Sequence, residues 1–322
     1  VKDILPHLKQ GHLVSLESTT YPGSTEEIIA SAIKKKGFKI GEDIFLVYSP
    51  ERESPGSGVQ LSTIPKVIGG YSDKCLEVGK KVYSAFFDEL VPVENLKVAE
   101  LTKLLENIHR SVNLGMINEF KIICDSMNVD PFSVINAAKT KPYGFVPYYP
   151  GPGWGGHCIP VDPFYFSWKA KEYGHNSTFI DLSGEINNRV IDWLQNKIYF
   201  VLNQVGKSIK NSQILLLGLS YKENIDDARE SPSLGIFDWL ITQGANVDYA
   251  DKYFPVFPQT RKFGVIDKKN TSISKEILNK QDLIVLLTAH DYFDYQLIKN
   301  ESKLIIDCKG IYSPDNKKIF RG

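Results

Sequence analysis

Hydrophobic and polar positions follow two alternating periods in the first part of the chain. Short apolar runs at 13–19 and 43–50 end in turn-forming residues, and an amphipathic stretch at 24–37 separates them. Ser24 stands three residues before Glu27, the spacing of a capping box, so this stretch predicts a helix. The pattern continues with a strand-like run and a helical stretch at 65–71 and 73–87. Strand–helix–strand alternation of this kind predicts a parallel sheet covered by helices.

The period changes between residues 93 and 206, where apolar residues recur at three- and four-residue spacing. Residues 96–127 keep this spacing without an internal proline and predict one long helix, buried on more than one face. A short helix is expected at 130–139, with Pro131 in its first turn. A second long helix is expected at 177–206.

The remaining residues, 207–322, return to alternating strands and helices. Buried strands are expected at 213–222, 245–251, 281–290 and 303–308, and a helix ended by glycine at 231–244. The fold class predicted is therefore α/β, with two Rossmann-like, doubly wound domains at 1–92 and 207–322 joined by the long-helix region at 93–206. Ligands of the second domain are expected beyond the carboxyl ends of its strands.

Composition excludes several classes of protein. The 322 residues include 38 Lys and Arg and 38 Asp and Glu, so no overall field favours nucleic acid or an acidic membrane surface. No apolar run reaches the roughly 18 residues of a membrane span, and the first residues have no apolar signal core. The four cysteines are far apart and form no C-x-x-C pair, which is typical of a reduced, cytoplasmic protein.

Residues 148–166 hold four glycines and four prolines around a histidine, a cysteine and an aspartate. Gly151, Gly153 and Gly156 have the spacing of the dinucleotide fingerprint G-x-G-x-x-G. A real fingerprint follows a buried strand and opens a helix, whereas prolines precede, interrupt and follow this one. Adjacent His157 and Cys158 also lack the ligand spacing of a zinc site. We therefore expect neither a dinucleotide loop nor a metal here.

Cys158 is the strongest nucleophile candidate in the sequence. Gly155 and Gly156 allow a tight turn and close approach of the backbone to a ligand, and they place the thiol on a loop. The alternative is that Cys158 is a small buried hydrophobe, as most free cysteines are. Asp162 either shares the site or serves as the N-cap of the next helix before Pro163, and both roles are compatible.

Polar residues on the long helix and at two strand ends complete the candidate set. Lys103 and Asn107 are four residues apart and face the same way, with Glu100 one turn earlier. The alternative is an ordinary solvated face, although the neighbouring positions are largely apolar. A lysine that reaches a site can stabilise an oxyanion. Glu51 follows the end of a strand and is a candidate general base, and Glu53 is the second choice for that role. Thr19 lies on another loop that follows a strand end, where it could contact a ligand.

Together these stretches resemble the UDP-sugar 6-dehydrogenases, which oxidise the C6 alcohol of a nucleotide sugar to a carboxylate. The motifs are "ESTTYPGST", "SPERESPG", "AELTKLLENIHR", "GPGWGGHCIPVDP", "LGLSYKENIDDARES" and "LLTAHDYF", in the family's order. The nearest branch is similar to the UDP-N-acetylhexosamine 6-dehydrogenases of bacterial polysaccharide synthesis. The resemblance implies NAD as cofactor, UDP-N-acetylglucosamine or UDP-N-acetylmannosamine as substrate, and a homodimer formed through the helix at 96–127.

The resemblance also implies a role for each matched residue. Cys158 captures the C6 aldehyde as a thiohemiacetal that becomes a thioester, and Glu51 handles water in its hydrolysis. Lys103 and Asn107 stabilise the oxygen at C6. The remaining assignments are Asp162 in proton transfer, Thr19 beside the nicotinamide and the catalytic water, Tyr149, Gly155 and Lys222 on the substrate, and Arg229 toward the dinucleotide.

Two departures from the family pattern change the expectations. The glycine fingerprint and the acidic ribose-binding residue are expected roughly 100 residues upstream of "ESTTYPG", so the sequence predicts that about half of the NAD domain is missing and that NAD binds poorly. An inactive nucleotide-sugar-binding or scaffold fragment is then the alternative function. Lys139 and Lys141 stand where some relatives have an arginine, and Lys309 replaces another arginine, without its bidentate fork. A cysteine hydrolase with His157 as base is disfavoured, because adjacent side chains on extended backbone point apart.

Overall fold

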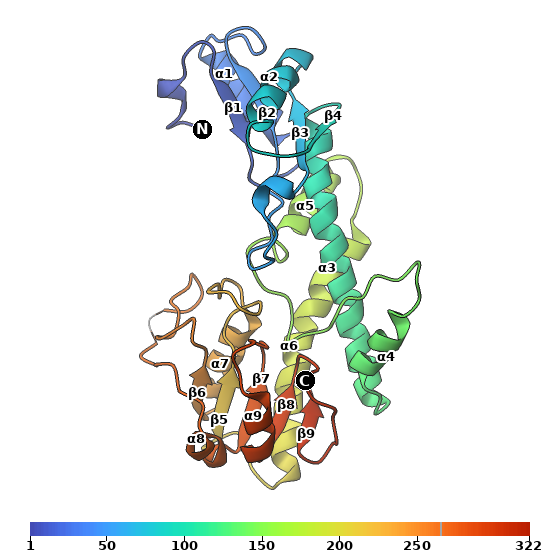
Figure 1. Ribbon diagram of the computed structural model, residues 1–322, viewed down its shortest axis with the longest axis vertical. Helices are drawn as coiled ribbons and strands as arrows, with labels where there is room; N and C mark the ends of the chain where they lie inside the picture. Colours follow the sequence, from blue (N-terminus) through green and yellow to red (C-terminus); the bar gives the residue numbers. More distant parts are fainter. Residues whose placement is uncertain (265) are drawn as a thin grey trace. The chain divides into compact units, whose positions relative to one another are not determined.

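The computed structural model describes residues 1–264 and 266–322 and separates into two compact units (Figure 1). The first unit comprises residues 1–109 and 161–177, and the second comprises residues 110–160 and 178–322. The boundary falls inside the long helix α3 (Leu96–Ser126), so the expected central region contributes residues to both units. The three-part division of the chain stays a prediction.

The sheet of the first unit has the order β1-β2-β3-β4, with strands Leu13–Leu16, Phe45–Tyr48, Lys66–Gly70 and Leu90–Val93. β1 and β2 are parallel, as are β3 and β4, but β2 and β3 are antiparallel. The connection between β2 and β3 contains only a 3-10 turn, η3 (Leu61–Thr63), and no crossover helix. A parallel pair needs such a crossover, so the expectation of a wholly parallel sheet is wrong at this one joint.

The helix expected at 24–37 begins as a π-helical turn, η2 (Thr25–Ala30), and continues as α1 (Ser31–Lys35). The predicted capping box is wrong, because Ser24 makes no side-chain cap. The buried carboxylate of Glu100 takes that place. It accepts hydrogen bonds from the backbone N–H groups of Gly23 and Thr25 and from the Thr25 hydroxyl. α2 (Asp73–Tyr83) follows its expected pattern, with Ser72 as the N-cap.

The predicted long helices are present as α3 and α6 (Thr178–Gln204). The short helix α4 (Pro131–Ala138) has Asp130 as its N-cap, accepting from the Phe132 N–H at 3.4 Å. Helix α5 (Asp162–Glu172) begins at Asp162, and its N-cap residue is Val161. The expectation that Asp162 is the N-cap is therefore wrong by one position.

The sheet of the second unit is wholly parallel, with the order β6-β5-β7-β8-β9. Its strands are β5 (Gln213–Leu217), β6 (Asn246–Ala250), β7 (Leu283–Leu286), β8 (Ile305–Asp307) and β9 (Ile319–Arg321). Ile214 and Leu216 face a core shared with α6 and α7 (Pro232–Thr242). Leu215 and Leu217 face a second core with α8 (Lys275–Lys280) and α9 (Tyr295–Glu301). Burial of both faces explains why these strands read as continuous apolar runs.

The strand order of the second unit reverses between β5 and β7. From β5 the chain passes through α7 to β6 on one side, and it returns through α8 to β7 on the other. The crevice outside the carboxyl ends of strands at such a reversal is the usual ligand site of an open α/β sheet. With its two sheet-containing units and long helices, the structure confirms the predicted α/β fold class.

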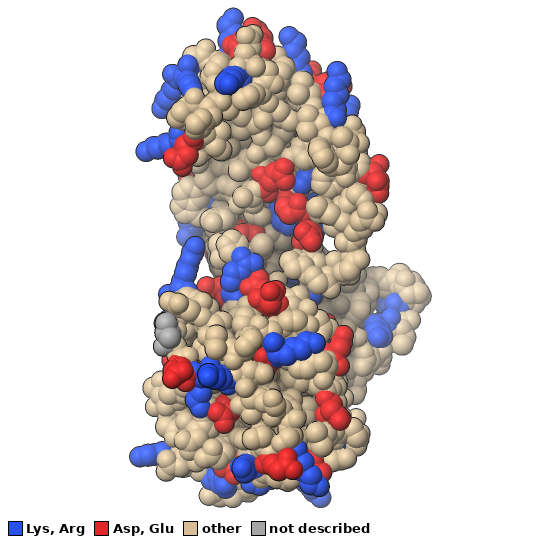
Figure 2. All heavy atoms as spheres, turned by 60° about the vertical axis from the view of Figure 1, so that its left-hand side comes forward, with Lys and Arg blue, Asp and Glu red and all other residues tan. Residues whose placement is uncertain are grey.

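Charged side chains of both signs are mixed over the face seen in Figure 2, in keeping with the balanced composition. In the part of the chain that the structure describes, no helix is both long enough and apolar enough to cross a membrane.

Candidate active site

A cavity of about 180 Å³ lies in the second unit, beyond the carboxyl ends of β5 and β7. The turn after β5 contributes Ser220, Tyr221 and Lys222, and β7 is followed by Leu287 and Thr288. The start of α7, residues 231–233, forms another part of the wall. The glycine-rich segment 149–155 and Ile159 also line the cavity. This cavity, which we name the β5–β7 pocket, lies where the strand order predicts a ligand.

The β5–β7 pocket is basic. Arg110, Lys222 and Lys309 line it, and the described lining residues include no aspartate or glutamate. Ser231 caps α7 by accepting from the Ser233 N–H at 3.3 Å, so the positive end of an 11-residue helix also borders the pocket. Cationic side chains and a helix N-terminus together favour an anion such as a diphosphate. Sequence reasoning missed Arg110, although it lies on the same helix as Lys103 and Asn107.

Close packing requires glycine at positions 155 and 156. A Cβ on Gly155 would lie 2.6 Å from Cβ of Tyr221 and 3.3 Å from Cδ of Pro232. Gly156 has a φ of +86° and donates its N–H to the Arg229 carbonyl at 2.9 Å. The element directly before the segment is the helix α4 and not a strand, and no helix begins until Asp162, so the interpretation of its G-x-G-x-x-G as a coincidence of spacing is confirmed.

Two buried side chains of α3 hold the same segment by its backbone. Asn118 accepts from the Gly151 N–H at 3.0 Å, and the amine of Lys121 donates to the Gly151 carbonyl at 2.9 Å. Lys121 is fully buried with its amine 4.6 Å from the centre of the Trp193 ring, and burial lowers its pKa to about 8. Sequence reasoning missed both residues. The available signal was a pair of polar residues one turn apart on this helix, and it does not stand out because α3 has many other polar residues.

Cys158 is exposed, whereas Cys75, Cys124 and Cys308 are buried. The alternative that Cys158 is a buried hydrophobe is therefore wrong, and its role as nucleophile stays a prediction. Burial raises the pKa of the Cys308 thiol to about 12, which makes that residue a poor nucleophile at neutral pH. His157 is exposed as well.

In the first unit the structure brings together Asn107 and Asp162. Both are buried, and the Asn107 amide donates to the Asp162 carboxylate at 2.7 Å. Lys103 lies one turn earlier on α3 and is half-buried. Glu100, a turn earlier again, is fully buried and bound to the helix start at residues 23–25, so its role is structural. Of these polar residues on α3, Glu100 therefore anchors a helix start, whereas Lys103 and Asn107 stay candidates for the site.

Glu51 leaves β2 in a half-buried position. Its carboxylate accepts from the backbone N–H groups of Arg52 at 2.7 Å and Glu53 at 2.6 Å, and it pairs with the Lys66 amine at 3.4 Å. Burial alone would raise the pKa of Glu51, but the Glu53 N–H and the Lys66 charge outweigh it and lower the pKa. The side chain is therefore a carboxylate at neutral pH. Thr19 is half-buried in the loop after β1.

Two other candidates have local partners within the second unit. The Tyr149 hydroxyl donates to Oδ1 of Asn136 at 2.9 Å, and its ring stacks on Phe132 beside the β5–β7 pocket. The Arg229 guanidinium is held by the Asp227 carboxylate at 2.7 Å. Its expected reach toward the dinucleotide stays a prediction. In the described part of the chain no three His, Cys, Asp or Glu side chains gather closely enough to hold a metal ion.

Family models match most of the chain. Three models of the UDP-glucose/GDP-mannose dehydrogenase family match it in order: the NAD binding domain at residues 1–87, the central domain at 97–189 and the UDP binding domain at 215–314. The chain belongs to this family. The β5–β7 pocket lies partly in the UDP binding domain, at the turns that follow its two strands.

Several of the relatives are named as enzymes of N-acetylated sugars. UDP-N-acetyl-D-mannosamine dehydrogenase of Methanococcus maripaludis is 32% identical over 97% of this chain and 69% of its own length. UDP-N-acetyl-D-glucosamine 6-dehydrogenase of Pseudomonas aeruginosa is 32% identical over 92% of this chain and 69% of its own. The solved structure of UDP-D-ManNAc dehydrogenase from Pyrococcus horikoshii superposes with a TM-score of 0.85 at 28% identity, covering 100% of this chain and 74% of that one.

The NAD-binding domain model matches from residue 1. The comparisons therefore do not support the expectation that about half of this domain is missing, nor the weak NAD binding inferred from it. NAD is the cofactor of this domain, and the resemblance that predicted it is confirmed.

A cavity in the first unit has a lining that suits the nicotinamide and ribose end of NAD. A cavity of about 650 Å³ is lined by Glu17, Glu51 and the aromatic rings of Tyr83, Phe86 and Phe87. Carboxylates can accept hydrogen bonds from ribose hydroxyls, and carboxylates and aromatic rings both attract the cationic nicotinamide ring. The negative charge of the carboxylates would repel a diphosphate. The start of the helix at residues 24–25 is already bound by Glu100. Glu51 lines this cavity and Thr19 does not, and the expected place of both residues at the nicotinamide end stays a prediction.

Proposed function

We propose that the chain oxidises the C6 alcohol of a UDP-N-acetylhexosamine to a uronic acid in an NAD-dependent, four-electron reaction that serves surface polysaccharide synthesis. One observation carries the proposal. The exposed Cys158 directly precedes Ile159 and follows Gly155 by three residues, and both of these neighbours line a basic pocket at the strand-order reversal of a UDP-binding domain. An exposed thiol beside a diphosphate site suits covalent capture of a nucleotide-sugar aldehyde.

The β5–β7 pocket supports the substrate class. Arg110, Lys222 and Lys309 supply positive charge for the diphosphate, while Tyr149 and the backbone at Gly155 border the same space. The names of the two relatives differ in the epimer at C2 of the sugar, so both UDP-N-acetylglucosamine and UDP-N-acetylmannosamine are candidate substrates. Lysine at position 309 gives a point charge on the diphosphate in place of a bidentate fork.

The proposed chemistry assigns each side chain one task. Bound NAD+ supplies the hydride acceptor for each of two oxidations, one molecule per step. The Cys158 thiolate adds to the aldehyde carbon and forms a thiohemiacetal, which keeps the aldehyde from escaping. The second hydride leaves from that carbon and gives a thioester, which water then hydrolyses to the acid and the regenerated thiol. Two hydrides leave in all, which accounts for four electrons.

The remaining residues of the first unit stabilise charge and move protons. The Lys103 ammonium opposes the oxyanion at C6, and Asn107 donates to the same oxygen. The hydrogen bond from Asn107 to Asp162 fixes the orientation of the amide. Glu51 is charged at neutral pH because of its lowered pKa, so it can accept a proton from the water that attacks the thioester.

Incubation of the chain with NAD+ and each UDP-sugar, followed by absorbance of NADH, tests the proposal. We expect NADH with UDP-N-acetylglucosamine or UDP-N-acetylmannosamine and little with UDP-glucose. Cys158→Ser should abolish acid formation, because the serine hydroxyl stays protonated at neutral pH and is a far weaker nucleophile than a thiolate. Cys124→Ala, at a buried thiol, is the matched control and should retain activity. Calorimetric binding of the UDP-sugars without any NADH would instead identify a nucleotide-sugar-binding protein.

A homodimer through the long helices is also proposed. Within the second unit, Met116 and Ile123 of α3 and Phe179 and Leu182 of α6 are exposed apolar side chains, with Phe179 80% exposed. Exposed apolar residues on neighbouring helices are typical of a subunit interface. Light scattering should give twice the monomer mass, and Phe179→Lys should lower it. A monomeric wild-type chain would contradict this proposal.

A further inference from the structure

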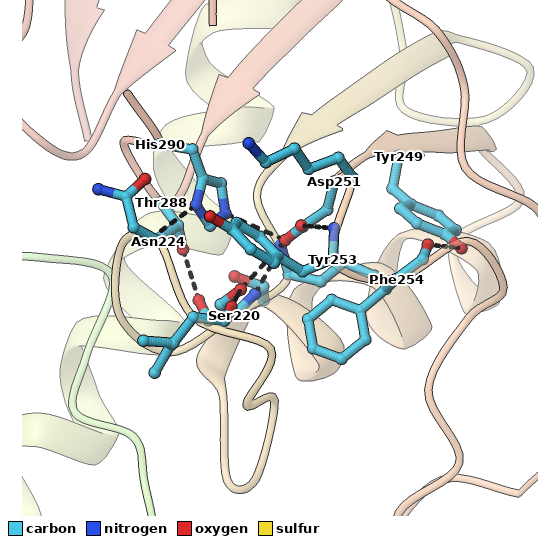
Figure 3. Close-up of polar contacts among 12 residues, drawn as sticks. Ser220, Asn224, Tyr249, Asp251, Tyr253, Phe254, Thr288 and His290 are labelled. Atoms are coloured by element: carbon cyan, nitrogen blue, oxygen red, sulfur yellow. Dashed lines mark hydrogen bonds and ion pairs between the residues drawn. The ribbon is translucent and has the colours of Figure 1, made fainter. Parts of the chain in front are cut away.

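A completely buried histidine, His290, lies beyond the end of β7 in the second unit (Figure 3). Its ring stacks on Tyr292 with centroids 5.2 Å apart, and the rings of Tyr253 and Phe293 lie at 5.3 Å and 5.5 Å. A core position surrounded by aromatic rings favours an apolar residue. A histidine there needs both ring nitrogens to be satisfied.

The two hydrogen bonds of the ring define where its proton is. The backbone N–H of Asn224 donates to Nδ1 of His290 at 3.0 Å. An amide nitrogen is always the donor, so Nδ1 carries no proton and Nε2 carries it. Nε2 then donates to the Asp251 carboxylate at 3.1 Å. The ring is therefore a neutral bridge: it accepts a hydrogen bond from Asn224 and donates one to Asp251.

The same carboxylate also holds the beginning of the turn that follows β5. Oδ2 of Asp251 accepts from the backbone N–H groups of Leu219 at 2.7 Å and Ser220 at 3.2 Å. Burial alone would raise the pKa of Asp251, but the hydrogen bond from His290 and the backbone donors lower it, so the acceptor stays ionised. Asp251 fixes the start of the turn 219–224, and His290 fixes its end.

The turn between these two anchors carries the wall of the β5–β7 pocket. Ser220, Tyr221 and Lys222 line the pocket, and Tyr221 is the residue against which Gly155 packs. The end of the turn has a specific backbone conformation, because Asn224 has a φ of +61°, a region that asparagine tolerates better than most residues other than glycine. The contacts of Asp251 and His290 come from outside the turn and hold its two ends.

On the basis of the proposed function, we propose that His290 and Asp251 are positioning residues that hold the turn 219–224 so that Lys222 meets the diphosphate of the UDP-sugar. Neither residue lines the pocket, so the effect is transmitted through the backbone of the turn. Loss of an anchor should weaken nucleotide binding more than it slows chemistry, because the turn contacts the part of the substrate that does not react.

Calorimetric titration of the full chain with UDP, together with steady-state kinetics and thermal unfolding, tests this role. His290→Phe keeps an aromatic ring but removes both hydrogen bonds, and we expect the Kd for UDP and the KM for the UDP-sugar to rise about 10-fold. The kcat should fall less than about threefold. Tyr249→Phe is the matched control. It removes the buried hydrogen bond from the Tyr249 hydroxyl to the Phe254 carbonyl, which does not touch the turn (Figure 3).

Two milder variants separate the anchors and keep the test valid if His290→Phe fails to fold. His290→Asn keeps an acceptor near Nδ1 for the Asn224 N–H, and His290→Gln keeps a donor near Nε2 for Asp251. Each should raise the Kd for UDP by about threefold, between wild type and His290→Phe. The Tyr249→Phe variant should lose thermal stability while the Kd for UDP stays within about twofold of wild type.

Wild-type affinity for UDP in the folded His290 variants would overturn the positioning role and leave the proposed function intact. A loss of affinity that follows thermal stability equally in Tyr249→Phe would overturn it too, since it would indicate a general effect on folding. Absence of UDP binding by the wild-type chain would overturn the proposed substrate, and the positioning role with it.

Discussion

The buried amine of Lys121 makes the stability of this protein depend on pH in a way that one substitution can isolate. Lys121 is fully buried, donates to the Gly151 carbonyl at 2.9 Å and lies 4.6 Å from the centre of the Trp193 ring. Burial is the main cause that lowers its pKa from 10.5 to about 8. Lys121→Met keeps a long, flexible side chain and removes the titrating group.

The sign and size of the effect follow from proton linkage. The folded protein releases this proton near pH 8, whereas the unfolded chain keeps it up to about pH 10.5. Between these values the unfolded state binds more protons, so the free energy of unfolding of the wild-type chain rises with pH. At about 1.4 kcal/mol for each pH unit the whole window amounts to about 3 kcal/mol, of which about 2 kcal/mol accrues between pH 8 and pH 10.

Urea denaturation at several pH values, followed by tryptophan fluorescence, measures this difference. Trp193 lies beside the amine, so its emission reports unfolding of the second unit. We expect the wild-type chain to gain about 2 kcal/mol relative to Lys121→Met between pH 8 and pH 10. Lys317→Met removes an exposed lysine of the same unit and should match wild type throughout. Parallel pH profiles for wild type and Lys121→Met would refute the reasoning.

Two further substitutions test the packing around the site. Gly155→Ala places a Cβ 2.6 Å from Cβ of Tyr221, so it should cost about 1–3 kcal/mol in unfolding free energy and weaken UDP binding. Gly235→Ala on α7 has no atom within 4 Å of its new Cβ and should be neutral or stabilising, and equal effects of the two changes would contradict the packing argument. Glu100→Gln leaves one acceptor oxygen where two carboxylate oxygens serve residues 23–25, and it should cost about 1–3 kcal/mol. A thermal midpoint equal to wild type would show that this carboxylate does not anchor the helix.

Elements with a strong local pattern could be predicted from the sequence. The helices α3 and α6 and the buried strand β5 follow directly from the spacing of apolar residues. The short strands β4 and β9 were missed, because three or four residues contain too few periods to stand out, and β4 includes Pro92. The helices α8 and α9, with six and seven residues, were missed for the same reason.

The features that sequence reasoning missed depend on residues far apart in the chain. Glu100 caps a helix that begins about 75 positions earlier, so a local capping box was predicted instead. The contact between His290 and Asp251 joins the ends of different strands. Cys158, Asn107 and Asp162 could be selected from sequence because the family motifs mark them. Arg110 and Lys121 were recognised only when the fold placed them beside the glycine-rich segment.

The most direct test of the central claim is intact-mass measurement of the Glu51→Gln variant after incubation with NAD+ and the UDP-N-acetylhexosamine. If Glu51 activates water, the thioester on Cys158 should accumulate. The protein mass should then increase by one UDP-hexosaminuronyl group, which hydroxylamine removes. The double variant Glu51→Gln, Cys158→Ser should show no such increase. Formation of two NADH per sugar by the Glu51→Gln variant at the wild-type rate, with no covalent adduct, would contradict the account.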